Sequence, residues 1–195
     1  MTTSVTTKQQ LFEVRWHGRG GQGAVTSAEL VAQAAIIEGR YGQAFPSFGP
    51  ERRGAPVLAF VRVSNDKPIR IRAEITIPDV IVVLDPGLLS VVNVTAGLKP
   101  DGTAVINTRK TPDEIRSEFG IKHRLATVNA TQIAKEILGV NIVNTTMVGA
   151  LLKATDLVNI ESVYEPLKGR FGKLADKNFA SMKKAYEETV VKEKE

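Results

Sequence analysis

LFEVRWHGRGGQG, residues 11–23, carries the strongest local pattern in this 195-residue chain. Apolar and polar side chains alternate over Leu11–Trp16, which is the period-two pattern of a strand. Glycines interrupt the pattern over Gly18–Gly23, and Ala24–Glu38 then follows as a run rich in small residues that ends at Gly39, which is typical of a helix. The segment therefore predicts a strand, a tight glycine turn and a helix, the opening unit of many α/β folds.

The rest of the chain repeats this alternation of strand and helix patterns. Further strands are expected at Pro56–Ser64, Ile69–Ile77, Val80–Leu84, Thr103–Asn107 and Arg124–Val128. Helices are expected at Pro86–Val94, after the capping residues Thr111 and Asn129, and at Asn144–Ala154, Ile160–Lys168 and Leu174–Val191. We therefore predict a three-layer α/β/α fold with a mostly parallel sheet that includes some antiparallel strands.

Three segments fall outside this pattern. Residues 1–10 are expected to form a flexible leader before a single domain, residues 11–195. Tyr41–Ala55 is expected to be irregular, and Lys192–Glu195 to be a solvated helix tail. The leader lacks the apolar core of a signal peptide, and no apolar run approaches the roughly 18 residues of a membrane span. We therefore expect a cytoplasmic protein that makes no membrane contact.

The residue inventory excludes several kinds of chemistry. The chain has no cysteine, and its only histidines are His17 and His123. It cannot supply a disulfide, a thiolate nucleophile or the ligands of a cysteine-bound iron–sulfur cluster, and a multi-histidine metal site is not expected. No Ser/His/Asp set or paired-carboxylate motif is evident. The sequence therefore predicts no catalytic residue and no metal ligand on this chain.

The positive charge is confined to one part of the sequence. The formal net charge is +5, and residues 1–72 contain ten Lys and Arg against five Asp and Glu, whereas the remaining residues are balanced. Eight of these ten basic residues are arginines, whose planar guanidinium suits phosphates and carboxylates. This surplus indicates an anionic ligand or partner for the first part of the chain.

The glycine loop satisfies the pattern G-x-G-x-x-G. Its residues are Gly18, Arg19, Gly20, Gly21, Gln22 and Gly23. Glycines allow a sharp turn, and the free N–H groups of the following helix attract anions. Three interpretations stay open: a packing turn without a ligand, an anion site, and an NAD or FAD site. For a dinucleotide site, Glu38 has the right spacing, but it lies on the predicted helix instead of at a strand end.

A second candidate is the segment 45–54, FPSFGPERRG, which two prolines and two glycines prevent from forming a helix or a central strand. Its proposed functional residues are Ser47, Glu51, Arg52, Arg53 and Gly54. A long loop in a compact domain is usually functional, and adjacent arginines near aromatic residues suit a phosphate, a carboxylate or a protein interface.

Three other features have simple structural explanations. Asp85 follows a buried strand, and capping the next helix accounts for it better than ligand binding. His17 adjoins the glycine loop, but a single histidine is more often structural. The helix start Asn144–Gly149 is adequately explained by helix packing.

Together, the glycine loop, the segment Ser47–Gly54 and the strand leading to Asp85 resemble the gamma subunits of 2-oxoacid:ferredoxin oxidoreductases, above all those of pyruvate:ferredoxin oxidoreductases (pyruvate synthases). The resemblance covers about Leu11–Tyr186. It implies a subunit of an enzyme that converts pyruvate, coenzyme A and oxidised ferredoxin to acetyl-CoA, carbon dioxide and reduced ferredoxin. The isolated chain is then expected to be inactive.

The same resemblance implies how the complex divides its cofactors. Thiamine diphosphate, Mg²⁺ and [4Fe-4S] clusters are expected on partner subunits, and alpha, beta and delta subunits are the expected partners. Gly18–Gly23 and Glu51–Gly54 would face those subunits or the path of coenzyme A, whose phosphates match the local arginines. A related complex acting on a branched-chain, aryl or 2-oxoglutarate substrate stays open.

Two other classes of function are weaker. A stand-alone NAD or FAD enzyme lacks the acid at the end of a strand. A nucleic-acid-binding module is disfavoured because aromatic residues are only 6% of the chain and no basic helix or stacking motif is present. No nucleic acid is therefore expected as a partner.

Overall fold

The computed structural model describes residues 11–47 and 53–195. The predicted leader lies outside these residues. The strands, in chain order, are β1 Leu11–Arg19, β2 Tyr41–Pro46, β3 Pro56–Ser64, β4 Val80–Val83, β5 Thr103–Asn107, β6 Arg124–Val128 and β7 Val190–Lys192. The α-helices are α1 Ala24–Ile37, α2 Pro112–Phe119, α3 Ala130–Leu138, α4 Asn144–Thr155, α5 Tyr164–Phe171 and α6 Ala175–Glu188. Short 3₁₀ helices are η1 Pro86–Ser90, η2 Ile160–Val163 and η3 Gly172–Leu174.

The strands form one sheet in the order β2-β3-β1-β4-β5-β6-β7. Strands β1, β4, β5 and β6 pair in parallel, whereas β3 is antiparallel to both of its neighbours and β7 is antiparallel to β6. Most strands therefore point the same way, as predicted, and only β3 and β7 are reversed.

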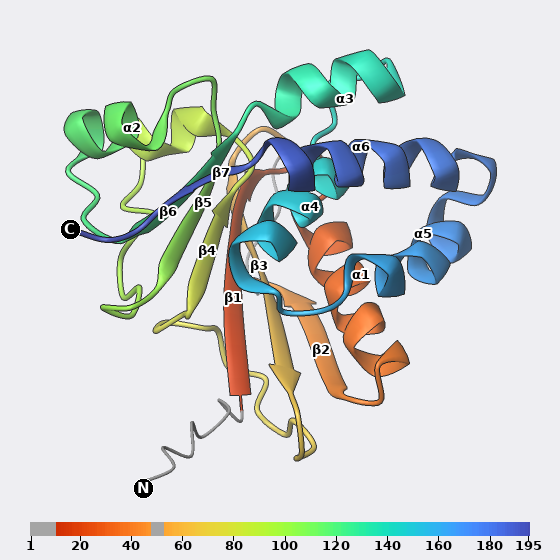
Figure 1. The fold of residues 1–195 in the computed structure, drawn as a ribbon. Coiled ribbons are helices and arrows are strands. Elements are labelled where there is room, and N and C mark those ends of the chain that lie inside the picture. The colour runs from red at the N-terminus through yellow and green to blue at the C-terminus, as the bar shows by residue number, and fades with distance from the viewer. Residues whose placement is uncertain (1–10, 48–52) are drawn as a thin grey trace, which may run out of the picture.

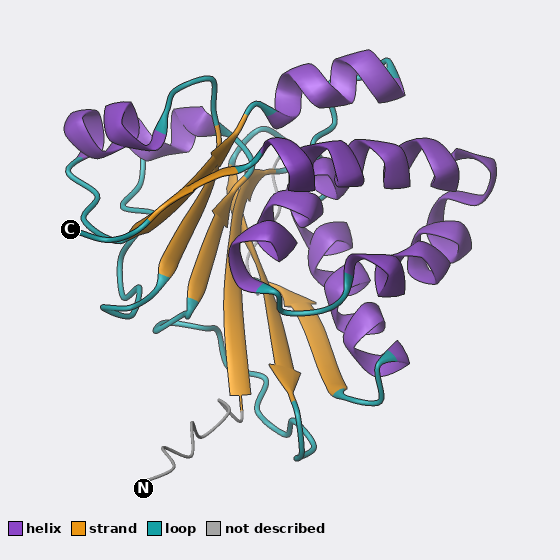
Figure 2. Ribbon diagram, viewed as in Figure 1, coloured by secondary structure: helices purple, strands orange, loops and turns teal. Residues whose placement is uncertain are grey.

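Helices cover both faces of the sheet, which confirms the three-layer α/β/α prediction. Figures 1 and 2 show α1, α4, α5 and α6 grouped on one side of the sheet and α2 on the other. The larger core lies on the first side, where Val14 and Trp16 of β1 pack with the small residues of α1 and with α4. A second core lies between β4, β5 and the segment from η1 to α2. Among the described residues, no helix combines the length and the apolar content needed to cross a bilayer.

Local capping signals placed α2 and α3 correctly. Thr111 and Glu114 form the expected capping box, and α2 ends at Gly120 in the left-handed conformation. The Asn129 side chain accepts a hydrogen bond from the backbone N–H of Gln132, and Gly139 ends α3 in the same left-handed manner.

Four expectations for individual elements were wrong. The helix expected at Pro86–Val94 is only the short 3₁₀ helix η1, which ends at Ser90. Tyr41–Ala55 is not irregular throughout, because it contains the edge strand β2 paired with β3. Ile69–Ile77 is not a strand: the carbonyls of Ile71 and Ala73 accept hydrogen bonds from the Arg62 side chain instead of from a neighbouring strand.

The fourth correction concerns the C-terminal segment. Helix α6 ends at Glu188, and β7 then adds an antiparallel edge strand to β6 instead of continuing the helix. The backbone of Glu193 is also held, because its carbonyl accepts a hydrogen bond from Arg116 at 2.7 Å. Lys192–Glu195 is therefore not a helix tail.

Candidate functional site at the joined glycine and arginine loops

The glycine loop lies where the sheet changes its pairing pattern. β1 pairs antiparallel with β3 on one side and parallel with β4 on the other, and the loop follows the carboxyl end of β1. In α/β proteins, this edge of the sheet is where ligands commonly bind.

The structure joins the two loops that the sequence singled out. Gly20 forms a bridge with Arg53. The Gly20 N–H donates to the carbonyl of Ala55 at 2.9 Å, and the Gly54 N–H donates to the carbonyl of Gly20 at 3.2 Å. The Arg19 guanidinium also donates to the Gly54 carbonyl, at 3.1 Å. The two predicted sites are therefore parts of one structural unit.

The other residues predicted in the second loop are placed only in part. The Ser47 hydroxyl donates to the Glu74 carboxylate at 2.5 Å, so its side chain is engaged at the protein surface. Arg53 is exposed and forms no ion pair within residues 11–47 and 53–195. Glu51 and Arg52 lie outside the described residues.

Asp85 organises the glycine loop from the end of β4. One of its carboxylate oxygens accepts from Arg19 Nε at 2.8 Å and from Gln22 Nε2 at 3.2 Å. The other oxygen accepts from the Gly87 N–H at 2.8 Å, so Asp85 caps η1 as expected. The Arg19–Asp85 ion pair means that the charge of Arg19 is already balanced within the protein.

Gln22 completes this unit through the other end of its amide. Its Oε1 accepts from the backbone N–H of Arg19 at 2.8 Å. Gly21 and Gly23 adopt positive φ angles of 93° and 78°, which L side chains rarely adopt. The loop is therefore shaped by hydrogen bonds of its own residues, and its backbone favours glycine at positions 21 and 23.

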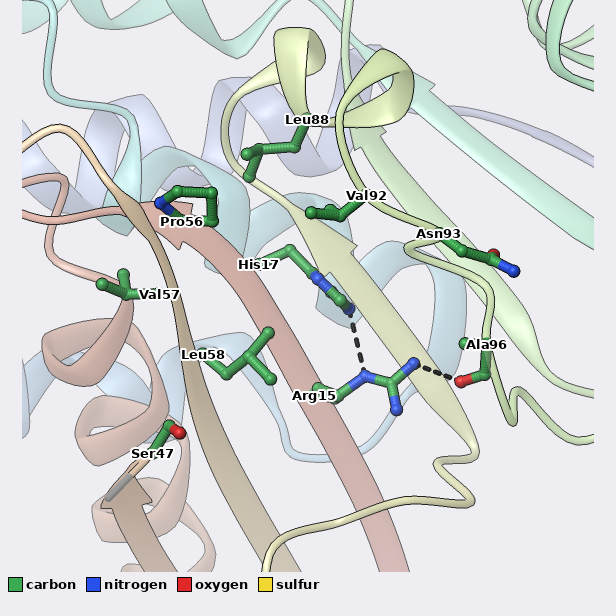
Figure 3. Close-up of a pocket in the computed structure, with 10 residues that line it drawn as sticks. All are labelled: Arg15, His17, Ser47, Pro56, Val57, Leu58, Leu88, Val92, Asn93 and Ala96. Atoms are coloured by element: carbon green, nitrogen blue, oxygen red, sulfur yellow. Dashed lines mark hydrogen bonds between the residues drawn. The ribbon is translucent and has the colours of Figure 1, made fainter. Parts of the chain in front are cut away.

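A cavity of about 440 Å³ lies next to this unit on the second face of the sheet. Figure 3 shows Arg15 and His17 of β1 beside Leu58 of β3, with Val92 and Ala96 on the segment after η1. The wall of the cavity is mostly apolar, and Pro56, which follows the segment 45–54 and begins β3, also lines it.

Arg15 is a buried cation that the protein satisfies without a carboxylate. The residue is only 7% exposed to solvent. Besides His17, it donates to the carbonyls of Ile75 at 3.4 Å, Val94 at 3.1 Å and Ala96 at 2.5 Å. Burial lowers the pKa of the Arg15 guanidinium from its ordinary value. Arg15 therefore holds two distant loop segments against β1.

His17 is neutral and oriented by Arg15. It is 5% exposed, and its Nε2 accepts from Arg15 Nε at 3.1 Å, which assigns the proton to Nδ1. Burial, and then the charge of Arg15, lower the pKa of His17 to about 3. A base with this pKa is too weak for proton transfer near pH 7, so the geometry suits binding instead of catalysis.

The sequence analysis did not single out Arg15. Alternation in β1 places Glu13, Arg15, His17 and Arg19 on one face, and β1 pairs with β3 over its whole length and with β4 over Val14–His17. A row of charged side chains on a strand expected to lie between two layers was the available signal.

Glu38 does not provide the acid that a dinucleotide site needs, because its carboxylate is engaged before the start of β2 and not at the end of that strand. Glu38 lies after the end of α1, where its carboxylate accepts from the Asn159 N–H at 2.6 Å and from Arg40 at 3.4 Å. β3 separates β2 from β1, so the first two strands in the chain are not neighbours, as they are in a Rossmann fold.

Comparison with known proteins gives consistent results. Residues 13–188 match the pyruvate ferredoxin/flavodoxin oxidoreductase family. The pyruvate/ketoisovalerate oxidoreductases common subunit gamma of Thermococcus litoralis is 56% identical, over 94% of this chain and 100% of its own. The pyruvate synthase subunit PorC of Methanothermobacter marburgensis is 52% identical, over 91% of this chain and 97% of its own. The solved structure of pyruvate oxidoreductase subunit PORC from Thermotoga maritima has a TM-score of 0.85 and 36% identity, and covers 95% of this chain and 100% of that one.

Proposed function

The chain belongs to the pyruvate ferredoxin/flavodoxin oxidoreductase family and is a subunit of a 2-oxoacid:ferredoxin oxidoreductase, and from this premise we propose that it is the gamma subunit of a pyruvate:ferredoxin oxidoreductase. The complex oxidises pyruvate in the presence of coenzyme A to acetyl-CoA and carbon dioxide, and passes the electrons to ferredoxin. The observation that carries this proposal is the near full-length match to a common subunit gamma, at 56% identity, and to a pyruvate synthase subunit PorC, at 52% identity.

In this proposal, the chain contributes structure and binding, and its partners contribute the redox cofactors. The absence of cysteine is compatible with iron–sulfur clusters located on partner subunits. Thiamine diphosphate and Mg²⁺ also belong to partner subunits, and the complex operates in the cytoplasm. The neutral, buried His17 supports a binding role for this chain.

The joined loops form this chain's part of the coenzyme A path or of a subunit interface. Arg53 supports this assignment because it is exposed beside the glycine loop and has no carboxylate partner in the described residues. An arginine in this position suits the phosphates of coenzyme A or an acidic surface of a partner.

A second substrate is favoured by one observation. The relative from Thermococcus litoralis is named as a gamma subunit common to pyruvate and ketoisovalerate oxidoreductases. We propose that this chain, too, assembles with more than one set of partners, because substrate selection would then lie where thiamine diphosphate binds and not on this chain.

Purification from native cells tests both proposals. The tagged chain is expected to bring down thiamine- and cluster-containing subunits, with pyruvate oxidation that depends on coenzyme A. Activity toward 3-methyl-2-oxobutanoate, with a second set of subunits, would support the shared role. A monomer without partners, or one with turnover of its own, would refute the assignment.

The loop assignment is tested in the assembled enzyme. Replacing Arg53 by Ala is expected to raise the KM for coenzyme A several-fold, or to weaken assembly if the loop contacts a partner. Replacing Arg52 as well should enlarge the effect, and Arg70→Ala, an exposed arginine on another segment, is the control. Unchanged kinetics together with an unchanged complex size would exclude both versions.

A further inference from the structure

A second cavity, of about 370 Å³, opens beside the glycine loop and shares no lining residue with the cavity of Arg15 and His17. It lies between the N-terminal ends of α1 and α4 and the junction of α5 with α6. Its polar lining includes Gly23, Asn144 and Lys177, and its apolar lining includes Ile142 and Leu174.

Two helices begin at this cavity without a cap. The first hydrogen bonds of the two helices join Ser27 N–H to Gly23 C=O and Met147 N–H to Val143 C=O, so the N–H groups that precede them lack an acceptor in the helix. Neither helix has a side-chain cap or an acidic residue in its first turn, in contrast to α2 with its capping box. Both positive dipole ends are therefore left uncompensated.

The two helix starts are held together as a preformed unit. The Ser27 hydroxyl contacts the carbonyls of Gly23 at 3.2 Å and Asn144 at 3.0 Å, one from each helix start. A Cβ at Gly23 would lie only 2.5 Å from Asn144 Nδ2, so the absence of a side chain there allows the amide to sit against the glycine loop.

The side-chain amide of Asn144 has no hydrogen-bond partner among the described residues. The residue is only 6% exposed, and its side-chain amide makes no hydrogen bond to any described part of the chain. Neighbouring Asn178, in contrast, is fully engaged: it accepts from Thr145 at 2.7 Å and donates to the Leu174 carbonyl at 2.9 Å. The amide lines the cavity and, unlike Trp16 Nε1 and Arg40 Nε, is not a fully buried atom without a partner, so solvent or a ligand can reach it.

The charges around the cavity favour an anion. Lys177 lines it, and no acidic residue of the described ranges 11–47 and 53–195 does. Arg170 reaches the first turn of α1 by donating to the Thr26 hydroxyl at 3.4 Å. The apolar wall includes Ile142 and Leu174, which are large hydrophobic side chains left exposed. This combination suits an anionic group attached to an apolar or aromatic body.

We propose that this cavity binds a nucleotide through its phosphates. The phosphates lie at the paired N-termini of α1 and α4, where the Asn144 amide donates a hydrogen bond to them and Lys177 adds charge. The base lies against the apolar wall near Leu174. Gly21 and Gly23 of the glycine loop line this cavity, so coenzyme A bound here would rest on the loop assignment above, whereas a free adenine nucleotide would be an additional ligand. The two ligands carry the same chemistry and are separated by the test.

The test titrates the full chain with inorganic pyrophosphate, ADP and coenzyme A by calorimetry. Asn144→Asp keeps the shape but places a carboxylate at both helix starts, so pyrophosphate and ADP should bind at least about tenfold more weakly. Asn93→Asp adds the same charge to the first cavity and is the matched control, expected to bind as the unmodified chain does. Leu174→Asn should weaken ADP and leave pyrophosphate unchanged.

Each outcome decides the proposal. If coenzyme A shares the sensitivity to Asn144→Asp, the co-substrate is the ligand; if only ADP does, the site serves a separate nucleotide, and either result supports the proposal. Absence of binding by the unmodified chain at millimolar ligand overturns it. Binding that survives Asn144→Asp, or that is lost in Asn93→Asp instead, also overturns it, and thermal unfolding of each variant verifies that it is folded.

Discussion

The two cavities beside the glycine loop differ in how far the polar side chains that line them are hydrogen-bonded within the protein. In the first, the donors of Arg15 are met by His17 and by backbone carbonyls from two loop segments. In the second, the amide of Asn144 and the N–H groups at two helix starts have no acceptor in the described residues. The charged side chain of Arg15 is therefore structural, whereas the neutral amide of Asn144 is available to a ligand.

The largest expected effect comes from removing the Arg15 side chain, which tests whether it stabilises the fold. Arg15→Met keeps the length and apolar stem of the side chain but leaves the carbonyls of Ile75, Val94 and Ala96 without donors. We expect the free energy of unfolding to fall by about 3–5 kcal/mol, as for loss of a buried polar network. Urea unfolding measures it, with the exposed Arg70→Met as the control. A loss below about 1 kcal/mol would mean that Arg15 is not structural.

The next effect is a pH dependence caused by His17. Its folded-state pKa of about 3 lies below the ordinary value of 6.5, so the unfolded chain binds more protons between these values. His17 therefore makes stability fall as the pH drops from about 6.5 toward 3, by up to about 1.4 kcal/mol for each pH unit.

This dependence is isolated by comparison with His17→Gln, which retains an acceptor for Arg15 but does not titrate. Unfolding curves at pH 7, 6, 5 and 4 should show a steeper loss for the unmodified chain than for the variant. Equal slopes would show that His17 titrates normally in the folded state.

A smaller effect is expected where the loop ion pair is partly exposed. Arg19 and Asp85 have side-chain exposures of 30% and 22%, so solvent screens their attraction. A double-mutant cycle with Arg19→Met and Asp85→Asn should give a coupling of about 1 kcal/mol, weakened by high salt. A coupling near zero would assign the shape of the loop to its glycines and Gln22 alone.

Sequence reasoning succeeded where a few neighbouring residues determine the structure. The capping box of Thr111 and the Asn129 cap fixed the starts of α2 and α3, because both signals act within one turn. It failed at Ile69–Ile77, whose carbonyls are taken by Arg62 and Arg15 from another part of the chain. It also missed β7, which exists only because it pairs with the distant β6.

In the candidate site, too, the features set by neighbouring residues were predictable and those set by distant contacts were not. The glycine loop was predictable from its spacing, but its union with Arg53 and Gly54 depends on how β1 and β3 are brought together. The significance of Asn144 depends on the absence of a partner, which only the packed structure reveals, so helix packing was the reasonable interpretation from the sequence.

The smallest expected effect is on the free energy of unfolding when Asn144 is replaced. It tests whether the Asn144 amide, unlike Arg15, contributes little to stability. If the amide has no partner, Asn144→Asp loses no hydrogen bond and gains attraction to two helix dipoles, which is opposed by the cost of burying a carboxylate. We expect unfolding at pH 7 to become harder by about 0.5 kcal/mol without ligand, and Asn144→Ala to change it by less than about 0.5 kcal/mol. Since the gain needs the ionised form, it should vanish as acid protonates the new carboxyl. If both variants instead lose more than about 1 kcal/mol, the amide holds the two helix starts together, and the second cavity would be structural in the way that the first is.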